Sequence, residues 1–155
     1  MRLRVRPATA DDLMLVFEWA NDPVTRSMSF EQNSISLADH KEWFSNVLSD
    51  NSSPFLIIEG EKHEGNWVPI AQVRFSREGV INMSLDNKFR GQHLATPAIQ
   101  QAIEYAKNTL NVDVITAYIK PENIASRKVF EKAGFHLQRE ATVKGSASLE
   151  YTYPL

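Results

Sequence analysis

The first fifty residues predict one strand followed by two helices. Apolar and polar residues alternate from Leu3 to Arg6, which is typical of a short strand. Two segments then repeat apolar residues every three or four positions, and each follows a hydroxyl residue that has an aspartate three positions later, the pattern of a helix capping box. We therefore expect helices after Thr9 and after Ser36, the first ending before Pro23 because proline disfavours helical geometry in the residue that precedes it.

The remaining hundred residues predict six strands and two helices. Three apolar or alternating runs follow residue 54 and are separated by Gly-containing turns, one of them over residues 60–66. Helical spacing returns after Leu94 and after Asn123, and Lys144-Gly145 forms the turn of a closing hairpin. The expected strands are 55–59, 67–75, 80–85, 112–119, 137–142 and 148–153, and the expected helices are 94–110 and 123–133.

This order of elements predicts one mixed α/β (α+β) domain that spans residues 1–155. A chain of 155 residues has the length of one domain, and it contains neither an internal repeat nor a low-complexity tract.

Composition and charge exclude several classes of function. With 17 basic and 19 acidic residues the net charge is −2, which disfavours a nucleic-acid partner. The absence of cysteine removes disulfides, thiolate metal ligands and a cysteine nucleophile, and we expect no metal site. The first residues lack the apolar stretch of a secretory signal, and no apolar run approaches the roughly 20 residues of a membrane span. We therefore expect a cytoplasmic protein with no membrane partner.

The start of the helix near Leu94 has the features of an anion site. Proline is tolerated only in the first turn of a helix, so Pro97 places the helix start at about Leu94. The free N–H groups of that turn and the positive end of the helix dipole attract anions. Arg90 adds a charge, and Gly91 lets the backbone approach a ligand closely. The alternative is an ordinary strand-to-helix turn with one exposed Arg; the glycine and lysine spacing of a P-loop is absent.

Two motifs in this part of the chain resemble the GCN5-related N-acetyltransferase (GNAT) family. Residues 90–95, Arg-Gly-Gln-His-Leu-Ala, match both ends of the family's pyrophosphate motif, although His93 stands where a Gly is usual. Residues 123–135, preceded by Pro121, match the family's pantetheine-lining segment that ends in Gly-Phe. The resemblance covers nearly the whole chain and implies the GNAT acyl-CoA N-acyltransferase fold, with a mixed central sheet of about six to seven strands flanked by about four helices.

The resemblance implies acetyl-coenzyme A (acetyl-CoA) as cofactor and a small-molecule amine as acceptor, and it leaves a homodimer open. The strand over residues 80–85 would offer backbone groups to the pantetheine arm, and the two motifs would hold the rest of the cofactor. The implied cofactor-binding residues are Met83, Leu85, Arg90, Gly91, Gln92, His93, Leu94, Ala95, Thr96, Asn123, Ser126, Arg127 and Phe130.

The catalytic residues are less clear from the resemblance. Many relatives place a proton-donating Tyr four residues after the Ser of the second motif, where this chain has Phe130. Candidates for the general acid are therefore Ser126, Tyr118 or a water molecule, and His40 or water would accept the proton of the amine. Direct transfer in a ternary complex is expected because no cysteine is present to carry the acyl group.

The first third of the chain is expected to choose the acceptor. Its pattern resembles acetyltransferases of bacterial nucleotide-linked amino sugars, such as those of the pseudaminic acid pathway. An Arg after a Pro-terminated helix suits a diphosphate, and aromatic faces suit a sugar or base ring; the alternative is that the aromatic residues and His40 belong to the core. The candidate substrate-binding residues are Arg26, Ser29, Phe30, His40, Trp43, Gln72 and Arg74.

Three functions thus remain open at this point. The leading one is an N-acetyltransferase that acts on a nucleotide-linked amino sugar, or alternatively on a protein N-terminus or an amino acid. The second is an acyl-CoA-binding module without turnover, because His93 and Phe130 depart from the family pattern. The third is an α/β scaffold that binds neither.

Overall fold

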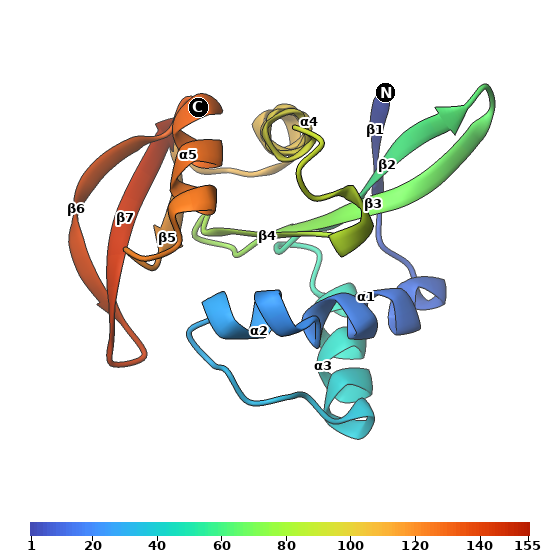
Figure 1. Cartoon of the computed structure of the whole chain (residues 1–155), viewed down its shortest axis with the longest axis horizontal. Helices are drawn as coiled ribbons and strands as arrows, with labels where there is room; N and C mark the ends of the chain where they lie inside the picture. The colour runs from blue at the N-terminus through green and yellow to red at the C-terminus, as the bar shows by residue number, and fades with distance from the viewer.

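The computed structural model describes residues 1–155, which form seven strands and five α-helices (Figure 1). In chain order these are β1 (Leu3–Pro7), α1 (Leu13–Ala20), α2 (Pro23–Met28), α3 (Leu37–Ser49), β2 (Phe55–His63), β3 (Asn66–Phe75), β4 (Ile81–Leu85), α4 (Ala95–Thr109), β5 (Val114–Ile119), α5 (Ile124–Lys132), β6 (His136–Val143) and β7 (Ser146–Pro154), with 3-10 turns over Ala10–Asp12 and Asn87–Phe89.

The seven strands of the expected mixed sheet fall into two parts that meet at a single bridge. An antiparallel sheet has the order β1-β2-β3-β4, and a second has the order β5-β7-β6. The two sheets meet at one parallel bridge between Val80 and Thr116, where the Thr116 N–H donates to the Gly79 carbonyl over 2.9 Å. Beyond that bridge β4 and β5 share no ladder, so the edge of β4 that faces β5 is open.

The helices cover the four-stranded sheet from both sides. In Figure 1, α4 lies above this sheet, and α1, α2 and α3 lie below it. The face toward α4 carries the larger core, which includes Val73 of β3, Ile81 of β4 and Ile99 of α4. The opposite face packs Phe55 and Ile57 of β2 against α1 and α3 in a smaller core. The four-stranded sheet therefore has a large core on its α4 face and a smaller core on the face toward α1 and α3.

Several helix ends predicted from the sequence are confirmed. Thr9 and Asp12 form the capping box, and the Ser36 hydroxyl accepts the Asp39 N–H. The Asn123 side chain caps α5 by accepting the Ser126 N–H over 3.2 Å. These caps satisfy amides that have no partner inside the helix.

The end of α5 also follows the prediction. Gly134 has φ 105°, a left-handed conformation that glycine adopts without a steric penalty. The chain then turns back so that the Phe135 N–H donates to the Phe130 carbonyl, and the two rings pack edge to face at 5.0 Å.

The structure corrects two predictions. Residues 21–23 do not only end α1, because Asp22 caps α2 through the Thr25 N–H, with Pro23 at the first helical position. The sequence contains this capping pattern, but Pro23 was interpreted only as the end of α1, so the fifth helix was not predicted. The predicted turn over residues 60–66 is also shorter, because β2 runs on to His63 and pairs with Asn66.

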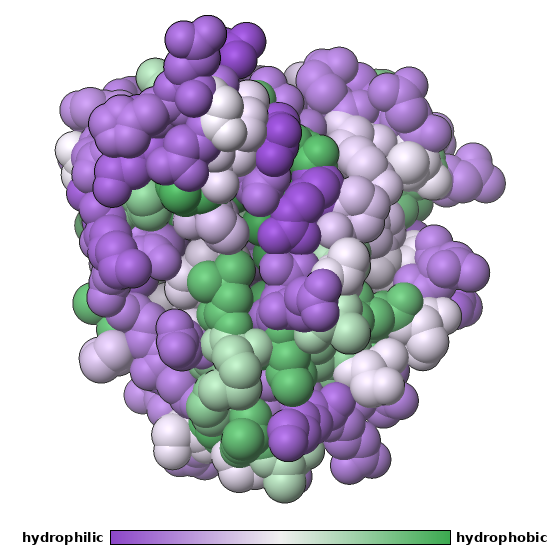
Figure 2. All heavy atoms as spheres, turned by 90° about the vertical axis from the view of Figure 1, so that its right-hand side faces the viewer, coloured by the Kyte–Doolittle hydropathy of each residue, from purple (hydrophilic) through white to green (hydrophobic).

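The face at the right of Figure 1 combines a hydrophilic upper part with apolar residues lower down. Turned toward the viewer in Figure 2, it is mostly hydrophilic, with an apolar strip in its lower half. Met14 of α1 and Leu37 of α3 are among the exposed large apolar residues. Exposed apolar side chains of this kind are ordinary on protein surfaces.

We predict that Phe130→Ala lowers the free energy of unfolding by about 3–5 kcal/mol, because it removes a buried ring and leaves a cavity beside Phe135. Urea denaturation measures the change. Leu137→Ala is the control, since Leu137 is 50% exposed and should cost little. Equal losses in the two variants would contradict the placement of the Phe130 ring in the core.

Candidate functional site

The loop between β4 and α4 presents a row of unused backbone amides. The N–H groups from Gly91 to Thr96 donate to no acceptor in the protein, whereas those of Phe89 and Arg90 on one side and Ala98 on the other are bonded. Gly91 and His93 have φ of 75° and 59°, so the loop winds through two left-handed residues before α4 begins. This is the backbone geometry that the anion-site prediction requires.

The histidine at the usual glycine position fits this loop. His93 adopts a left-handed φ, the conformation for which glycine is common, and His is among the non-glycine residues that tolerate it best. Its side chain is exposed and lines a groove, so it does not block the backbone.

Two lysines that the sequence analysis missed face the same groove. A cavity of about 190 Å³ lies between the start of α4 and α5, and Lys128 and Lys132 line it together with Ala95 and Thr96. Their i, i+4 spacing on a predicted helix places them on one face, and that signal was available in the sequence. The two charges add the attraction for phosphate that the sequence analysis assigned to Arg90.

The Arg90 side chain corrects that assignment. Its guanidinium pairs with Asp22 at 2.8 Å and also lies 3.3 Å from the Thr25 hydroxyl, so it is turned toward α2. The hydrogen bond from Arg90 is the main reason that the pKa of Asp22 is lowered, and the Thr25 amide contributes. The charge of Arg90 is thus already compensated, although its backbone remains part of the loop.

The open edge of β4 has the backbone groups that the sequence analysis assigned to a pantetheine arm. The Asp86 N–H donates to Ile70, and the Val80 carbonyl accepts from Ser76, so these residues point toward β3. Backbone groups alternate in direction along a strand, which turns those of Met83 and Leu85 toward the gap before β5, where the Leu85 carbonyl accepts a long hydrogen bond of 3.4 Å from Arg90.

The second motif has a structural role at most of its positions. Arg127 donates to the Pro121 carbonyl and to the Tyr151 hydroxyl, and the latter bond is the main cause of its raised pKa. Phe130 is 6% exposed and belongs to the large core, so a direct contact with a cofactor is not supported. Among these residues only the Ser126 hydroxyl makes no hydrogen bond within the protein.

His40 is buried, so it cannot reach a substrate to act as the base that the sequence suggests. It is 1% exposed, its Nε2 lies 2.9 Å from the Leu13 carbonyl, and its ring stacks on Phe44 at 5.6 Å. The carbonyl fixes the proton on Nε2, and Nδ1 is buried without a partner. The alternative reading of a core histidine is therefore the correct one.

The predicted acceptor residues gather on the face of the sheet toward α3. Gln72 and Arg74 lie on one face of β3, and the Gln72 amide donates to the Ser84 hydroxyl over 2.9 Å. The Arg74 guanidinium lies 4.9 Å from the Trp43 ring. Arg26 donates to the carbonyls of Glu31 and Asn33 and shapes the loop that contains Ser29 and Phe30.

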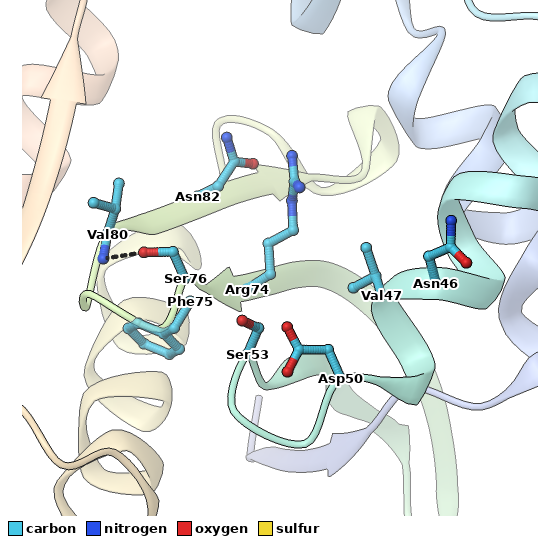
Figure 3. A pocket seen from close by; sticks show the side chains of 9 residues that line it. All are labelled: Asn46, Val47, Asp50, Ser53, Arg74, Phe75, Ser76, Val80 and Asn82. Atoms are coloured by element: carbon cyan, nitrogen blue, oxygen red, sulfur yellow. Dashed lines mark hydrogen bonds between the residues drawn. The ribbon is translucent and has the colours of Figure 1, made fainter.

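A cavity of about 440 Å³ opens beside these residues (Figure 3). Asn46, Val47 and Asp50 line it from α3 and its end, and Arg74 and Asn82 line it from β3 and β4. Figure 3 shows Arg74 and Asn82 pointing to the same side, away from Asp50. The cavity is large enough for part of a small polar molecule.

Tyr118 of β5 faces the same side of the molecule. Its hydroxyl lies 3.4 Å from Glu150 of β7, and burial and the Glu150 charge raise the pKa of the phenol. The side chain therefore keeps its proton at neutral pH. Lys120, two residues later, is 7% exposed, and its Nζ lies 5.7 Å from the Phe30 ring.

No three His, Cys, Asp or Glu side chains lie close enough together to bind a metal ion. None of the helices combines the length and the apolar character that crossing a bilayer requires.

Comparison with known proteins decides the family. The model of the acetyltransferase (GNAT) domain matches residues 2–136. The chain belongs to the GNAT acetyltransferase family. This assignment confirms the expected fold, the enzyme class and acetyl-CoA as cofactor.

Individual relatives are distant. YwnH of Bacillus subtilis, provisionally named a phosphinothricin acetyltransferase, is 26% identical over 141 residues, which cover 86% of this chain and 83% of YwnH. YjcK of the same organism, provisionally named an N-acetyltransferase, is 38% identical over 56 residues, which cover 36% of this chain and only 31% of YjcK.

Solved structures show the same GNAT fold. Spermidine N-acetyltransferase from Vibrio cholerae, in complex with CoA and spermine, superposes with a TM-score of 0.84 at 17% identity and covers 98% of this chain and 95% of that chain. AAC(6')-Ib, in complex with ribostamycin and coenzyme A, gives 0.83 at 22% identity over 99% and 94%. These relatives and structures do not support the resemblance to acetyltransferases of the pseudaminic acid pathway.

We predict that Arg90→Gln destabilises this GNAT domain by about 1 kcal/mol near pH 7, because the Asp22 carboxylate loses its partner. The folded-state pKa of Asp22 lies below the unfolded value of about 3.9, so the pair contributes above that pH and its contribution is lost as the pH falls further. Urea unfolding of both proteins from pH 7 to pH 3 should give a difference that shrinks below about pH 4.

The control is Lys107→Gln, which removes an exposed pair with Glu104 on α4 and should change stability little at any of these pH values. A difference between wild type and Arg90→Gln that stays constant down to pH 3 would contradict the role given to the Arg90–Asp22 pair.

Proposed function

We propose that this chain transfers the acetyl group of acetyl-CoA to the primary amine of a small acceptor, within a ternary complex. The observation that supports this most is a pair of open backbone features on either side of the 3-10 turn over Asn87–Phe89, namely the free edge of β4 and the unbonded amides of Gly91 to Thr96. An extended amide-rich chain that ends in a diphosphate fits such an edge followed by such a loop.

The cofactor would be held mainly by backbone groups. Met83 and Leu85 would bond the pantetheine arm, and the amides of residues 91–96 would bond the pyrophosphate, with Lys128 and Lys132 supplying charge. Acetyl-CoA supplies an activated thioester to this arrangement. Ser126, at the first turn of α5, would face the cofactor from the other side of the groove.

The chain's own residues must manage two proton transfers. A protonated amine has no lone pair, so its proton has to leave, and we assign that step to water because His40 is buried and bonded to Leu13. Tyr118 would return a proton to the departing sulfur, since its phenol stays neutral. Arg127 and Phe130 would support α5 without touching the reacting atoms.

For the acceptor we propose a nucleotide-linked amino sugar. Arg26 and Arg74 supply charge for its diphosphate, and Phe30 supplies an aromatic face beside Lys120. The relatives' names contain phosphinothricin, spermidine and an aminoglycoside as acceptors, so the family's amine chemistry is general and does not select among amines. An amino acid or a protein N-terminus is the alternative within the same reaction.

We predict that Thr96→Glu weakens CoA binding at least tenfold and slightly stabilises the free protein. Thr96 is at the second position of α4, where a negative charge favours the helix dipole by about 0.3–1 kcal/mol but repels a diphosphate. Calorimetric titration with CoA and thermal unfolding measure the two effects. Gln100→Glu, on the exposed side of α4 one turn later, is the control and should leave CoA affinity nearly unchanged.

The same two variants test turnover. Wild type and Gln100→Glu should release thiol from acetyl-CoA with at least one member of a panel of amino sugars, nucleotide-linked amino sugars, amino acids and peptides, and Thr96→Glu should release far less. CoA binding without thiol release from any amine would replace the proposal by a non-catalytic acyl-CoA-binding module. Activity on peptides alone would refute the amino-sugar acceptor.

We predict that Tyr118→Phe lowers kcat about 100-fold and leaves CoA affinity unchanged, because it removes the proton donor without changing the shape of the side chain. Steady-state thiol release over a range of pH measures the effect, with Ser126→Ala as the comparison. An unchanged kcat in Tyr118→Phe, together with a loss in Ser126→Ala, would move the role of general acid to Ser126.

A further inference from the structure

Arg74 is a partly buried cation for which the protein provides no anion. Its guanidinium forms no hydrogen bond and no ion pair, and its Nε has neither a partner nor contact with solvent. The only group stacked on it is the Trp43 ring, at 4.9 Å. A donor that is held out of water without an acceptor is costly, so the Nε–H of Arg74 favours a ligand that supplies an acceptor.

A second unbalanced cation lies beside it. Arg26 uses its terminal nitrogens on the Glu31 and Asn33 carbonyls and on the Ser29 hydroxyl, and its Nε is buried without a partner. Burial first, and the charge of Arg26 second, lower the pKa of Arg74. The two guanidiniums therefore repel each other, and no carboxylate lies between them.

The nearest acids are engaged elsewhere. Asp22 is paired with Arg90 and Glu31 with Lys144. Asp50 lines the same cavity as Arg74, but its carboxylate accepts hydrogen bonds from Ser52, and Figure 3 shows it at the opposite end. None of these three carboxylates is therefore free to form an ion pair with Arg26 or Arg74.

We propose that Arg74, with Arg26 beside it, binds a carboxylate or phosphate group of the acceptor amine and so selects acceptors that carry an anion. The inference rests on the proposed transferase activity and names the acceptor's chemical class. A guanidinium matches the planar, two-oxygen edge of either group, and burial strengthens the attraction. The two unpaired cations are thus part of an acceptor subsite.

Gln72 places the amine relative to that anion. Its Oε1 is buried without a donor, and it lies two residues before Arg74 on the same face of β3. Same-face side chains along a strand are about 7 Å apart, so the acceptor's N–H would reach Gln72 when its anion reaches Arg74. The subsite accordingly fits an amine a few bonds from its acidic group.

The same charges disfavour a different class of acceptor. A polyamine or another polycation would place its additional ammonium groups against Arg26 and Arg74, with no acidic partner to offset them. The acceptor preference is therefore expected to differ from that of the spermidine N-acetyltransferase that shares the fold.

The test compares amines in matched pairs that differ only in the anionic group. Glucosamine against glucosamine 6-phosphate tests phosphate, and an amino acid against its amide tests carboxylate. In wild type the anionic member should have the lower KM in at least one pair. Arg74→Gln should raise that KM about 10- to 100-fold, with little change in kcat or in the KM of the neutral member.

Two controls separate a binding role from a structural one. Arg77→Gln changes an exposed arginine nearby and should leave both KM values unchanged. Arg74→Gln should also unfold at a higher temperature than wild type without ligand, because it removes a buried unpaired charge. Inorganic phosphate should raise the melting temperature of wild type more than that of Arg74→Gln.

The experiment distinguishes failure of the anion-binding subsite from failure of the transferase proposal. Turnover of neutral and anionic members with equal KM, in wild type and variant alike, overturns the subsite and leaves the transferase intact. Absence of turnover with every amine overturns the transferase, and the phosphate-dependent melting shift then decides the subsite alone. A phosphate shift of equal size in wild type and Arg74→Gln overturns the subsite.

Discussion

The divergence of β4 from β5 is the constraint on which the other features of this molecule depend. The strands meet at Val80 and Thr116 and then separate, because each belongs to a sheet with its own partners. Inside a compact domain, unpaired strand edges are uncommon, since backbone N–H and C=O groups need partners. Here the edge of β4 is followed, after the 3-10 turn over Asn87–Phe89, by a loop with six unbonded amides, so two neighbouring stretches of backbone are left available for an extended ligand.

The two faces of the four-stranded sheet differ in how they attract anions. On the side of α4, neutral amides are combined with Lys128 and Lys132 in an exposed groove. On the side of α3, Arg26 and Arg74 are partly buried, and the Nε of each is out of contact with solvent without an acidic partner. The net charge of −2 conceals both, because the acidic excess lies elsewhere on the surface. Whole-chain charge therefore gives no guide to the charge of the site.

Local sequence signals predicted most of the helices and strands, whereas features that depend on contacts between distant segments were not predicted. The cap at Asn123 and the packing of Phe135 on Phe130 depend on neighbours within one turn, so the sequence was sufficient. The split of the sheet and the pairing of Arg90 with Asp22 join segments far apart in the chain, and no periodicity encodes them. His40 was misassigned because burial among aromatic rings, not residue type, decides whether an imidazole reaches a substrate.

The ion pair between Arg90 and Asp22 couples two segments of the structure, the start of α2 and the loop before α4. Asp22 caps α2, the helix whose last turn carries Arg26, while Arg90 opens the loop that precedes α4. Under the proposed function, a substitution in α2 that disturbs Asp22 would therefore also change the loop that is proposed to hold the cofactor.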